Sequence, residues 1–287
     1  SGGGGGVYVT EAAAVYAEDS TFQGNTTDEY GGGIHVAQDA AVTPTNVILN
    51  GGNSVVGNQA VLGGGFYIQD DGSQVVISGS QIEDNEASIT GGGIRLFGDA
   101  DLQLIGGSTL IRNTADSDGG GLAMYTGTVT MDDVTVHYNE ALGGDGGGVM
   151  QTQGILTASD PDIRFNTAHG DGGGIYRVGG ALVLAAATKQ SYLAVNDATR
   201  GGGLYDVSGE TVEIRALAGS GFSLNTNGAS DDGGAVYLSG GTGLNIYGDV
   251  TVSTNEATSD GGAFYVDGGS LVLDGGAAIG EPDLGGA

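Results

Sequence analysis

Residues 91–96 read Gly-Gly-Gly-Ile-Arg-Leu, and residues 119–124 read Gly-Gly-Gly-Leu-Ala-Met, one period later. Small residues, nearly always glycine, lead into a large apolar residue in this way throughout the chain. The ten apolar residues are Val7, Ile34, Phe66, Ile94, Leu122, Val149, Ile175, Leu204, Val236 and Phe264, separated by 26 to 32 residues. A repeat of this length predicts a solenoid, in which each unit stacks on its neighbours.

A second marker recurs in phase with the glycines: an apolar residue followed three positions later by Asn. The asparagines are Asn25, Asn58, Asn85, Asn113, Asn139, Asn166, Asn196, Asn225 and Asn255. We expect these side chains to stack at a turn, where they hydrogen-bond from unit to unit and satisfy turn backbone groups. We interpret this Asn ladder as structural, together with most of the 61 glycines, which suit tight turns and close backbone approach.

Three short stretches in each repeat alternate apolar and variable residues, as Ile94-Arg95-Leu96 does, and no window has sustained helical periodicity. Three strands and three turns in about 28 residues make one coil of a parallel β-helix, with coils about 4.8 Å apart. The sequence therefore predicts an all-β fold, a parallel β-helix solenoid of about ten coils. We expect residues 1–287 to form a single β-helix domain, an in-phase segment of a longer repeat array.

The composition excludes several kinds of partner. The 35 acidic residues outnumber seven Lys and Arg, and the formal charge is −28. Such a chain repels nucleic acid and anionic membrane surfaces, so we expect neither as a partner. The chain has no Cys, which excludes disulfides and thiolate metal sites. No apolar stretch approaches the length of a membrane span, and we expect no direct membrane insertion.

Both markers carry a family resemblance. The segments Gly234-Ala235-Val236 and Gly262-Ala263-Phe264 come closest to a Gly-Gly-Ala-aliphatic motif, and Phe22-Gln23-Gly24-Asn25 and Phe222-Ser223-Leu224-Asn225 match Phe-x-x-Asn. In these motifs the chain resembles the chlamydial polymorphic outer-membrane proteins and related autotransporter-passenger surface proteins. Most copies here have Gly in place of Ala, and most Asn motifs begin with Ile, Val or Leu. The resemblance implies a right-handed β-helix that is secreted or lies on a bacterial cell surface and serves in adhesion.

An acidic column is predicted four residues before the glycine-led apolar positions. It includes Asp118, Asp145 and Asp171 in successive coils, with Arg200 next in the same column. Three stacked Asp repel one another unless they are solvated or neutralised. We leave three interpretations open: a solvated turn, weak Ca²⁺ binding between the three carboxylates, or capping of the column by Arg200. We predict no other cofactor.

A tyrosine column is predicted one residue after the glycine-led apolar positions, on the outside of the coil. Its members are Tyr8, Tyr67, Tyr176, Tyr205, Tyr237 and Tyr265. One interpretation is strand propensity and packing between coils. The other is an exposed aromatic ladder that binds glycan rings or a partner protein.

One stretch interrupts the predicted interior. Where other coils place an aliphatic residue or Met, three successive coils place Gln151, Arg177 and Asp206. A buried charge needs a partner. Arg177 and Asp206 therefore either form an ion pair or point outward where the strand ends early.

The β-helix fold also serves polysaccharide lyases and hydrolases, so catalysis has to be weighed. Candidate residues are His169 and Asp171, and the pair Asp231 and Asp232. The His precedes the Asp pair, in the reverse of the hydrolase order, no Arg-x-Lys motif follows, and the coil lengths leave little room for cleft-forming loops. We therefore expect no enzyme.

The sequence predicts an extracellular structural or adhesive surface solenoid. We expect it to bind glycan or protein of a host or neighbouring cell along an outer face. Two alternatives remain open: a polysaccharide-binding or polysaccharide-active β-helix of the pectin-lyase type, and a subunit of a filament that self-associates end to end.

Overall fold

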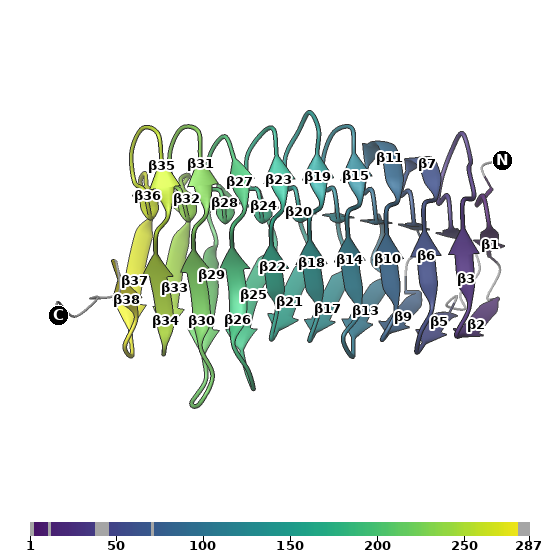
Figure 1. Cartoon of the computed structure of the whole chain (residues 1–287), viewed down its shortest axis with the longest axis horizontal. Helices are drawn as coiled ribbons and strands as arrows, with labels where there is room; N and C mark the ends of the chain where they lie inside the picture. The colour runs from purple at the N-terminus through teal and green to yellow at the C-terminus, as the bar shows by residue number, and fades with distance from the viewer. Residues whose placement is uncertain (1–2, 11–12, 38–45, 70–71, 281–287) are drawn as a thin grey trace, which may run out of the picture.

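The computed structural model describes residues 3–10, 13–37, 46–69 and 72–280. Short strands stack along the chain into an elongated solenoid, with β1 at one end of the rod and β36–β38 at the other (Figure 1). All regular elements in the described ranges are β-strands, and the strands of adjacent coils pair in parallel, as in Ile94↔Leu122. The predicted parallel β-helix is therefore confirmed. None of the described segments is a helix that could cross a membrane.

Each coil contributes one strand to three ten-stranded sheets, which we name A, B and C, and eight coils add a strand to a fourth sheet, D. Sheet A contains β1 (Val7–Val9), β4 (Ile34–Val36), β8 (Phe66–Ile68), β12 (Ile94–Leu96), β16 (Leu122–Met124), β20 (Val149–Gln151), β24 (Ile175–Arg177), β28 (Leu204–Asp206), β32 (Val236–Leu238) and β36 (Phe264–Val266). Sheet B contains β2 (Ala14–Glu18), β5 (Asn46–Asn50), β9 (Gln74–Ser78), β13 (Asp101–Ile105), β17 (Thr128–Asp132), β21 (Ile155–Ser159), β25 (Ala181–Ala186), β29 (Thr211–Ala216), β33 (Gly243–Tyr247) and β37 (Ser270–Asp274). Sheet C contains β3 (Thr21–Gln23), β6 (Ser54–Val56), β10 (Gln81–Glu83), β14 (Thr109–Ile111), β18 (Thr135–His137), β22 (Asp162–Arg164), β26 (Ser191–Ala194), β30 (Phe222–Asn225), β34 (Val250–Ser253) and β38 (Ala278–Ile279). Sheet D contains β7 (Gln59–Leu62), β11 (Glu86–Thr90), β15 (Thr114–Ala115), β19 (Glu140–Ala141), β23 (Thr167–Ala168), β27 (Asp197–Ala198), β31 (Gly228–Ala229) and β35 (Glu256–Ala257).

Sheet D is a difference from the predicted three strands per coil. Most of its strands have only two residues, a polar one followed by Ala, directly after the Asn ladder. The alanines face inward, and Ala141, Ala168 and Ala198 form a small apolar cluster of their own. Two residues are too few to produce an alternation that can be recognised in the sequence, which is why this sheet was not predicted.

The interior is a stack of aliphatic side chains, as expected. Ile94 pairs with Phe66 on one side and Leu122 on the other, and all three side chains are completely buried. Burial of one such side chain stabilises the fold by about 1.5–3 kcal/mol. Because every coil repeats this contribution, stability comes from contacts between neighbouring coils.

The glycine run is structural because the backbones of adjacent coils meet there. A Cβ on Gly92 would lie 2.4 Å from the carbonyl oxygen of Thr114 and 2.5 Å from that of Gly120. The residue before it, Gly91, has a φ of +71°, a conformation that glycine adopts without strain. This turn therefore determines how close the outward side chains before it lie to the outward side chains after it.

Candidate functional site

The glycine turn brings the predicted acidic and tyrosine columns together. Gly201, with a φ of +59°, turns the chain between Arg200 and Tyr205. The Arg200 guanidinium then lies 5.0 Å from the ring centre of Tyr205 and 5.2 Å from that of Tyr237. The two columns therefore form one strip along the outside of sheet A, which we call the glycine-turn strip.

Four of the six predicted tyrosines form a continuous stack in this strip. From Tyr176 through Tyr205 and Tyr237 to Tyr265, successive ring centres are 5.2, 4.9 and 4.8 Å apart, with planes within 10° of parallel. Tyr205 and Tyr237 are only 7% and 8% exposed. The prediction of an exposed ladder is wrong for these two, because the spacing of the coils equals the stacking distance of the rings. Each inner ring has both faces covered by its neighbours and offers no platform to a glycan.

The other two predicted tyrosines surround a histidine. The ring of His35 lies edge-on to those of Tyr8 and Tyr67, with centres 5.0 and 5.1 Å away, and Tyr30 stacks on Tyr67 at 4.9 Å. Tyr8 is exposed as predicted, whereas Tyr67 is buried, which corrects the prediction for that residue. His35 is also buried, neither of its ring nitrogens has a hydrogen-bond partner, and burial lowers its pKa to about 4.

The three predicted calcium ligands are linked into a ladder from coil to coil by hydrogen bonds between backbone N–H groups and carboxylates. The backbone N–H of Asp145 donates to the Oδ1 of Asp118 (2.9 Å), and that of Asp171 donates to the Oδ1 of Asp145 (2.8 Å). The ladder ends at Arg200, which donates to both oxygens of Asp171 at 3.0 and 2.6 Å. The predicted capping by Arg200 is therefore confirmed.

The calcium hypothesis stays a prediction, and these contacts join the carboxylates without a metal ion. Ca²⁺ takes six to eight oxygen ligands, whereas these carboxylates already accept hydrogen bonds from the next coil. Within the described ranges, no three His, Asp or Glu side chains are arranged to hold a metal. The calcium hypothesis thus gains no support from the geometry.

Burial raises the pKa values of two groups in the strip. It raises the pKa of Asp145, helped by the neighbouring charges of Asp171 and Asp118 and opposed by the hydrogen bond from the Asp171 backbone. Burial and the nearby Asp145 carboxylate also raise the pKa of the Tyr176 hydroxyl, which hydrogen-bonds to that carboxylate. The polar groups of the strip therefore satisfy one another, which supports a structural role.

The Asn ladder is confirmed at eight of its nine predicted positions. Asn139 is typical: its Nδ2 donates to the carbonyl of Leu110 and to the Oδ1 of Asn166, both at 3.0 Å. In the eighth coil the ladder residue is Asn227, and the prediction of Asn225 is wrong. Two overlapping apolar-x-x-Asn pairs occur there, and β30 is one residue longer than most sheet C strands. Asn225 is consequently the last residue of that strand.

The interruption of the core is a buried ion pair. The Nη1 of Arg177 donates to the Oδ2 of Asp206 at 2.5 Å, and neither side chain is exposed. Arg177 also donates to the carbonyl of Gly180, and Gln151 donates to that of Ala181 at 3.0 Å. The inward alternative of the prediction is therefore confirmed, and these polar groups close the corner between sheets A and B.

A surface that the sequence interpretation missed lies at the turn just before the Asn ladder. Three successive coils place Tyr138, Phe165 and Val195 there, and we call them the sheet C ridge. Their φ angles are +55°, +59° and +55°, in the left-handed region. The rings of Tyr138 and Phe165 stack at 4.8 Å, and Tyr138 is 54% exposed. In the sequence, this position is the residue directly before each ladder Asn. It varies from coil to coil and is glycine in two early coils, at Gly24 and Gly57.

Charged side chains accompany the ridge on sheet C. Asp162 lies 2.9 Å from the Nε2 of His137 and 2.5 Å from the Nε of Arg164. The guanidinium of Arg164 lies 4.3 Å from the ring centre of Tyr192. Burial disfavours ionised Asp162, but the hydrogen bonds from His137 and Arg164 outweigh it and lower its pKa. The ridge thus stands beside a compact ionic cluster.

Comparison with protein families identifies the fold independently. The family described as right handed beta helix region matches residues 1–184, more than half of the chain. The chain belongs to this right-handed β-helix family. Neither the curated proteins nor the solved structures gave a match to it. The handedness that the resemblance implied is therefore confirmed, whereas the finer resemblance to chlamydial surface proteins stays a prediction.

The predicted catalytic candidates do not converge in this right-handed β-helix. His169 lies 3.4 Å from Glu140, whereas Asp231 accepts a hydrogen bond from Ser259 and Asp232 accepts one from the backbone of Asp260. His169 follows β23 and the Asp pair follows β31, two coils further along, which is roughly 10 Å. Family membership does not decide catalysis, so the absence of an enzymatic activity stays a prediction.

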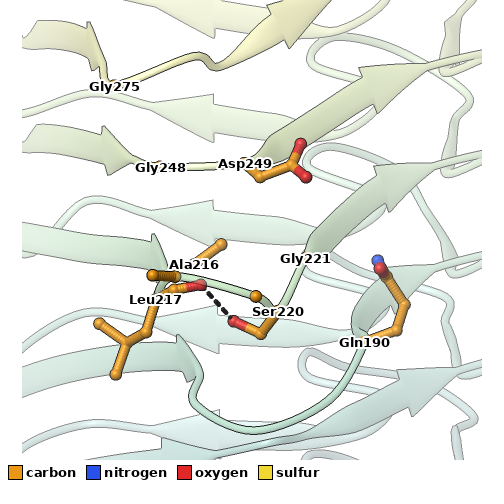
Figure 2. A pocket seen from close by; sticks show the side chains of 10 residues that line it. Gln190, Ala216, Leu217, Ser220, Gly221, Gly248, Asp249 and Gly275 are labelled. Carbon is orange, nitrogen blue, oxygen red and sulfur yellow. Dashed lines mark hydrogen bonds between the residues drawn. The ribbon is translucent and has the colours of Figure 1, made fainter.

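A groove lies beside the turn between β29 and β30 (Figure 2). It has a volume of about 710 Å³ and is lined by Gln190, Leu217, Ser220, Asp249 and several glycines. The Ser220 hydroxyl donates to the Leu217 carbonyl at 2.8 Å, the bond drawn in Figure 2, and is occupied in holding its own turn. The β-helix therefore presents a wide depression here, without a converging set of reactive groups.

Proposed function

We propose that this β-helix is a non-catalytic, extracellular surface solenoid that binds a partner protein through the sheet C ridge. One observation supports this most strongly: three successive coils keep bulky apolar residues, Tyr138, Phe165 and Val195, at an outward turn position with a left-handed backbone. The family resemblance to bacterial surface proteins supports the extracellular placement.

The free-energy cost of the left-handed backbone at the ridge exceeds the stabilisation that ring stacking provides. A non-glycine residue in the left-handed conformation costs about 1–2 kcal/mol, so Tyr138 and Phe165 together cost about 2–4 kcal/mol. A stacked aromatic pair contributes about 0.5–1.5 kcal/mol. At the equivalent Gly57, a Cβ would meet no atom within 4 Å, so packing does not require a side chain there. Polar residues such as Asp84, Arg112 and Thr226 have the same left-handed conformation at this turn in other coils, so the ridge is distinguished by three successive bulky apolar side chains.

The chemistry of the ridge favours a protein over a glycan. Phe165 covers one face of the Tyr138 ring at 4.8 Å, so that face cannot pack on a sugar. Exposed aromatic side chains of this kind are typical anchors of protein interfaces. The formal charge of −28 would draw a basic partner toward the solenoid over long range. We therefore propose a basic partner protein with an apolar contact surface.

The test measures adhesion of beads coated with the whole chain to cultured cells, with and without protease treatment of the cells. The ridge variant is the double substitution Tyr138→Gly and Phe165→Gly, which restores the residue that Gly24 and Gly57 place at this turn. The matched control is Tyr16→Gly, which removes an exposed tyrosine from sheet B. Melting curves establish that both variants are folded.

We expect wild-type beads and the control to bind untreated cells, with binding lost after proteolysis and weakened by added salt. Binding of the ridge variant should fall about tenfold or more, the loss typical of an interface anchor. Equal binding by the ridge variant would exclude the ridge as the contact surface. Binding that survives protease but not glycosidase treatment would show a glycan partner instead. If wild-type beads bind no cell surface, the adhesive function is rejected.

A further inference from the structure

Arg95 is the exception among the basic side chains of this acidic chain. In the part of the chain that the structure describes, each of the other six Lys and Arg residues lies within 4.0 Å of a carboxylate. Arg95 forms no ion pair with an acidic residue of the described ranges, although the sequence contains 35 acidic residues. A guanidinium left without an acid in such surroundings requires an explanation.

Aromatic rings surround the Arg95 guanidinium. It lies 4.5 Å from the ring centre of Tyr125, 5.6 Å from that of Tyr67 and 5.7 Å from that of Phe97. These residues come from three successive coils at the outer side of sheet A. Arg95 itself is in β12, and its partner in the next coil is Ala123, which is too small to cover it. The rings fix the position of the guanidinium, and the Arg95 residue remains partly exposed.

Most of the hydrogen-bonding capacity of Arg95 is unused. Its Nη1 donates to the Oγ1 of Thr90 at 3.0 Å, and its Nε is buried without a hydrogen-bond partner. A guanidinium has five N–H donors. Cation–π contacts compensate a charge only in part, by about 0.5–2 kcal/mol. An oxyanion that reached the two Nη atoms would complete the site with charge-assisted hydrogen bonds.

Phe97 adds an apolar surface next to this charge. Phe97 is 44% exposed, whereas Phe66 and Phe222 are buried. The ring is inclined to that of Tyr125 by 63°, with centres 5.9 Å apart, and the Arg95 guanidinium lies 5.7 Å from its centre. One face of a sugar ring presents C–H bonds that pack on such a surface, while a carboxylate or sulfate on the sugar can reach the adjacent guanidinium.

We infer that Arg95, Phe97 and Tyr125 form a binding site for an anionic sugar residue, with its carboxylate or sulfate on Arg95 and its ring on Phe97. This site lies on sheet A and the ridge lies on sheet C, so either can fail without the other. The net charge of −28 opposes an anionic ligand at long range. At physiological ionic strength the Debye length is about 8 Å, so distant carboxylates are largely screened and the local contacts dominate.

The experiment is titration calorimetry of the whole chain with four probes: a hyaluronan tetrasaccharide, a sulfated tetrasaccharide, neutral chitotetraose and an oligoglutamate of similar charge. The variants are Arg95→Gln, Arg95→Lys and Phe97→Ala. The matched control is Arg215→Gln, which removes an exposed guanidinium from sheet B near Glu213. Melting curves verify folding, and Arg95→Lys keeps the charge in case Arg95→Gln does not fold.

We expect the anionic tetrasaccharides to bind and chitotetraose not to bind. Loss of a charged hydrogen bond predicts at least about tenfold weaker binding for Arg95→Gln, and Arg95→Lys should also weaken binding because it lacks the planar fork. Phe97→Ala should weaken sugar binding, and Arg215→Gln should leave it unchanged. Comparing the carboxylated with the sulfated probe identifies the charged group.

Three outcomes would overturn the inference. If no anionic probe binds, Arg95 only packs between the rings. If oligoglutamate binds as tightly as the sugars, and Phe97→Ala has no effect, the site recognises a protein carboxylate. If Arg215→Gln weakens binding as much as Arg95→Gln, the sugars bind through nonspecific charge.

Discussion

The Asn ladder allows a sharp test between two neighbouring residues of the same type. Asn225 and Asn227 both follow an apolar-x-x-Asn pattern, but only Asn227 lies in the ladder. We therefore compare Asn227→Ala with Asn225→Ala. The two substitutions remove the same atoms two positions apart, so a difference between them reports the hydrogen bonds of the ladder and not the general cost of the change.

The magnitude follows from the bonds of the Asn227 side chain. Its Nδ2 donates to the carbonyl of Leu193 and to the Oδ1 of Asn255, and its Oδ1 accepts from the backbone and the Nδ2 of Asn196. Four hydrogen bonds at a net 0.5–1.5 kcal/mol each predict a loss of about 2–6 kcal/mol. The loss should lie in the upper part of this range, because Asn227 and its partners Asn196 and Leu193 are buried and water cannot readily replace the amide.

The assay is denaturant unfolding of both variants and the wild type, with thermal melting as a second probe. We expect a clearly lower midpoint for Asn227→Ala, and for Asn225→Ala a change within about 0.5 kcal/mol, as is usual for surface positions. In a solenoid the affected coils can open locally, so hydrogen exchange at the neighbouring ladder amides would show where stability is lost. Equal losses for the two variants, or a larger loss for Asn225→Ala, would refute the ladder register.

Three further outcomes follow from the described contacts. The pKa of His35 falls from 6.5 to about 4 on folding, so the stability that depends on its neutral form is present above pH 6.5 and is lost as the pH falls toward 4. The variant His35→Phe should therefore show a smaller dependence of melting temperature on pH over this range. An unchanged dependence would contradict the burial of a neutral imidazole. Arg177→Met should lower the free energy of unfolding by about 3–5 kcal/mol in a denaturant titration, because it leaves the Asp206 carboxylate buried without a partner. The double variant with Asp206→Leu should recover most of that loss, and no recovery would argue against the ion pair. Melting temperatures in calcium and in chelator should coincide, and a calcium-dependent rise that Asp145→Asn abolishes would restore the calcium hypothesis.

The solenoid could be predicted because its physical constraint repeats in every coil. A residue such as Gly92 cannot carry a Cβ without striking the next coil, and glycine occupies this position in all ten repeats. Ile94 and its equivalents are likewise fixed by complete burial. A constraint that acts ten times produces a period that a single sequence reveals, and the period predicts the direction in which each column points.

Register within one coil was harder to predict, because it depends on the length of a single strand. Leu224 pairs with Val252 of the next coil, whereas Phe222 pairs with Ser191 of the preceding coil, so Leu224 holds the apolar position that lies three residues before the ladder Asn. Both Phe222 and Leu224 begin an apolar-x-x-Asn pattern, so the sequence offers two equivalent solutions. Only the hydrogen bonds to Asn196 and Asn255 distinguish them.

Exposure could not be predicted from alternation. Alternation correctly placed Tyr205 outside the coil, but its exposure depends on what stands above and below it. The rings of Tyr176 and Tyr237 stack on it, and the Arg200 guanidinium lies against it. A column of identical aromatic residues buries itself, so repetition of a side chain on a solenoid argues for packing more than for recognition.

A residue that differs from the rest of its column argues for recognition more than for packing. Arg95 stands among tyrosines in its column, and Tyr138 occupies a turn position at which Gly57 fits without contacts. Stacking between coils offsets the cost of either choice only in part, because the described neighbours of Arg95 supply no acid and Tyr138 gains one ring contact at a left-handed turn. In a fold whose stability comes from repetition, a residue that departs from its column at a cost that its contacts offset only in part is the position at which contact with another molecule should be sought.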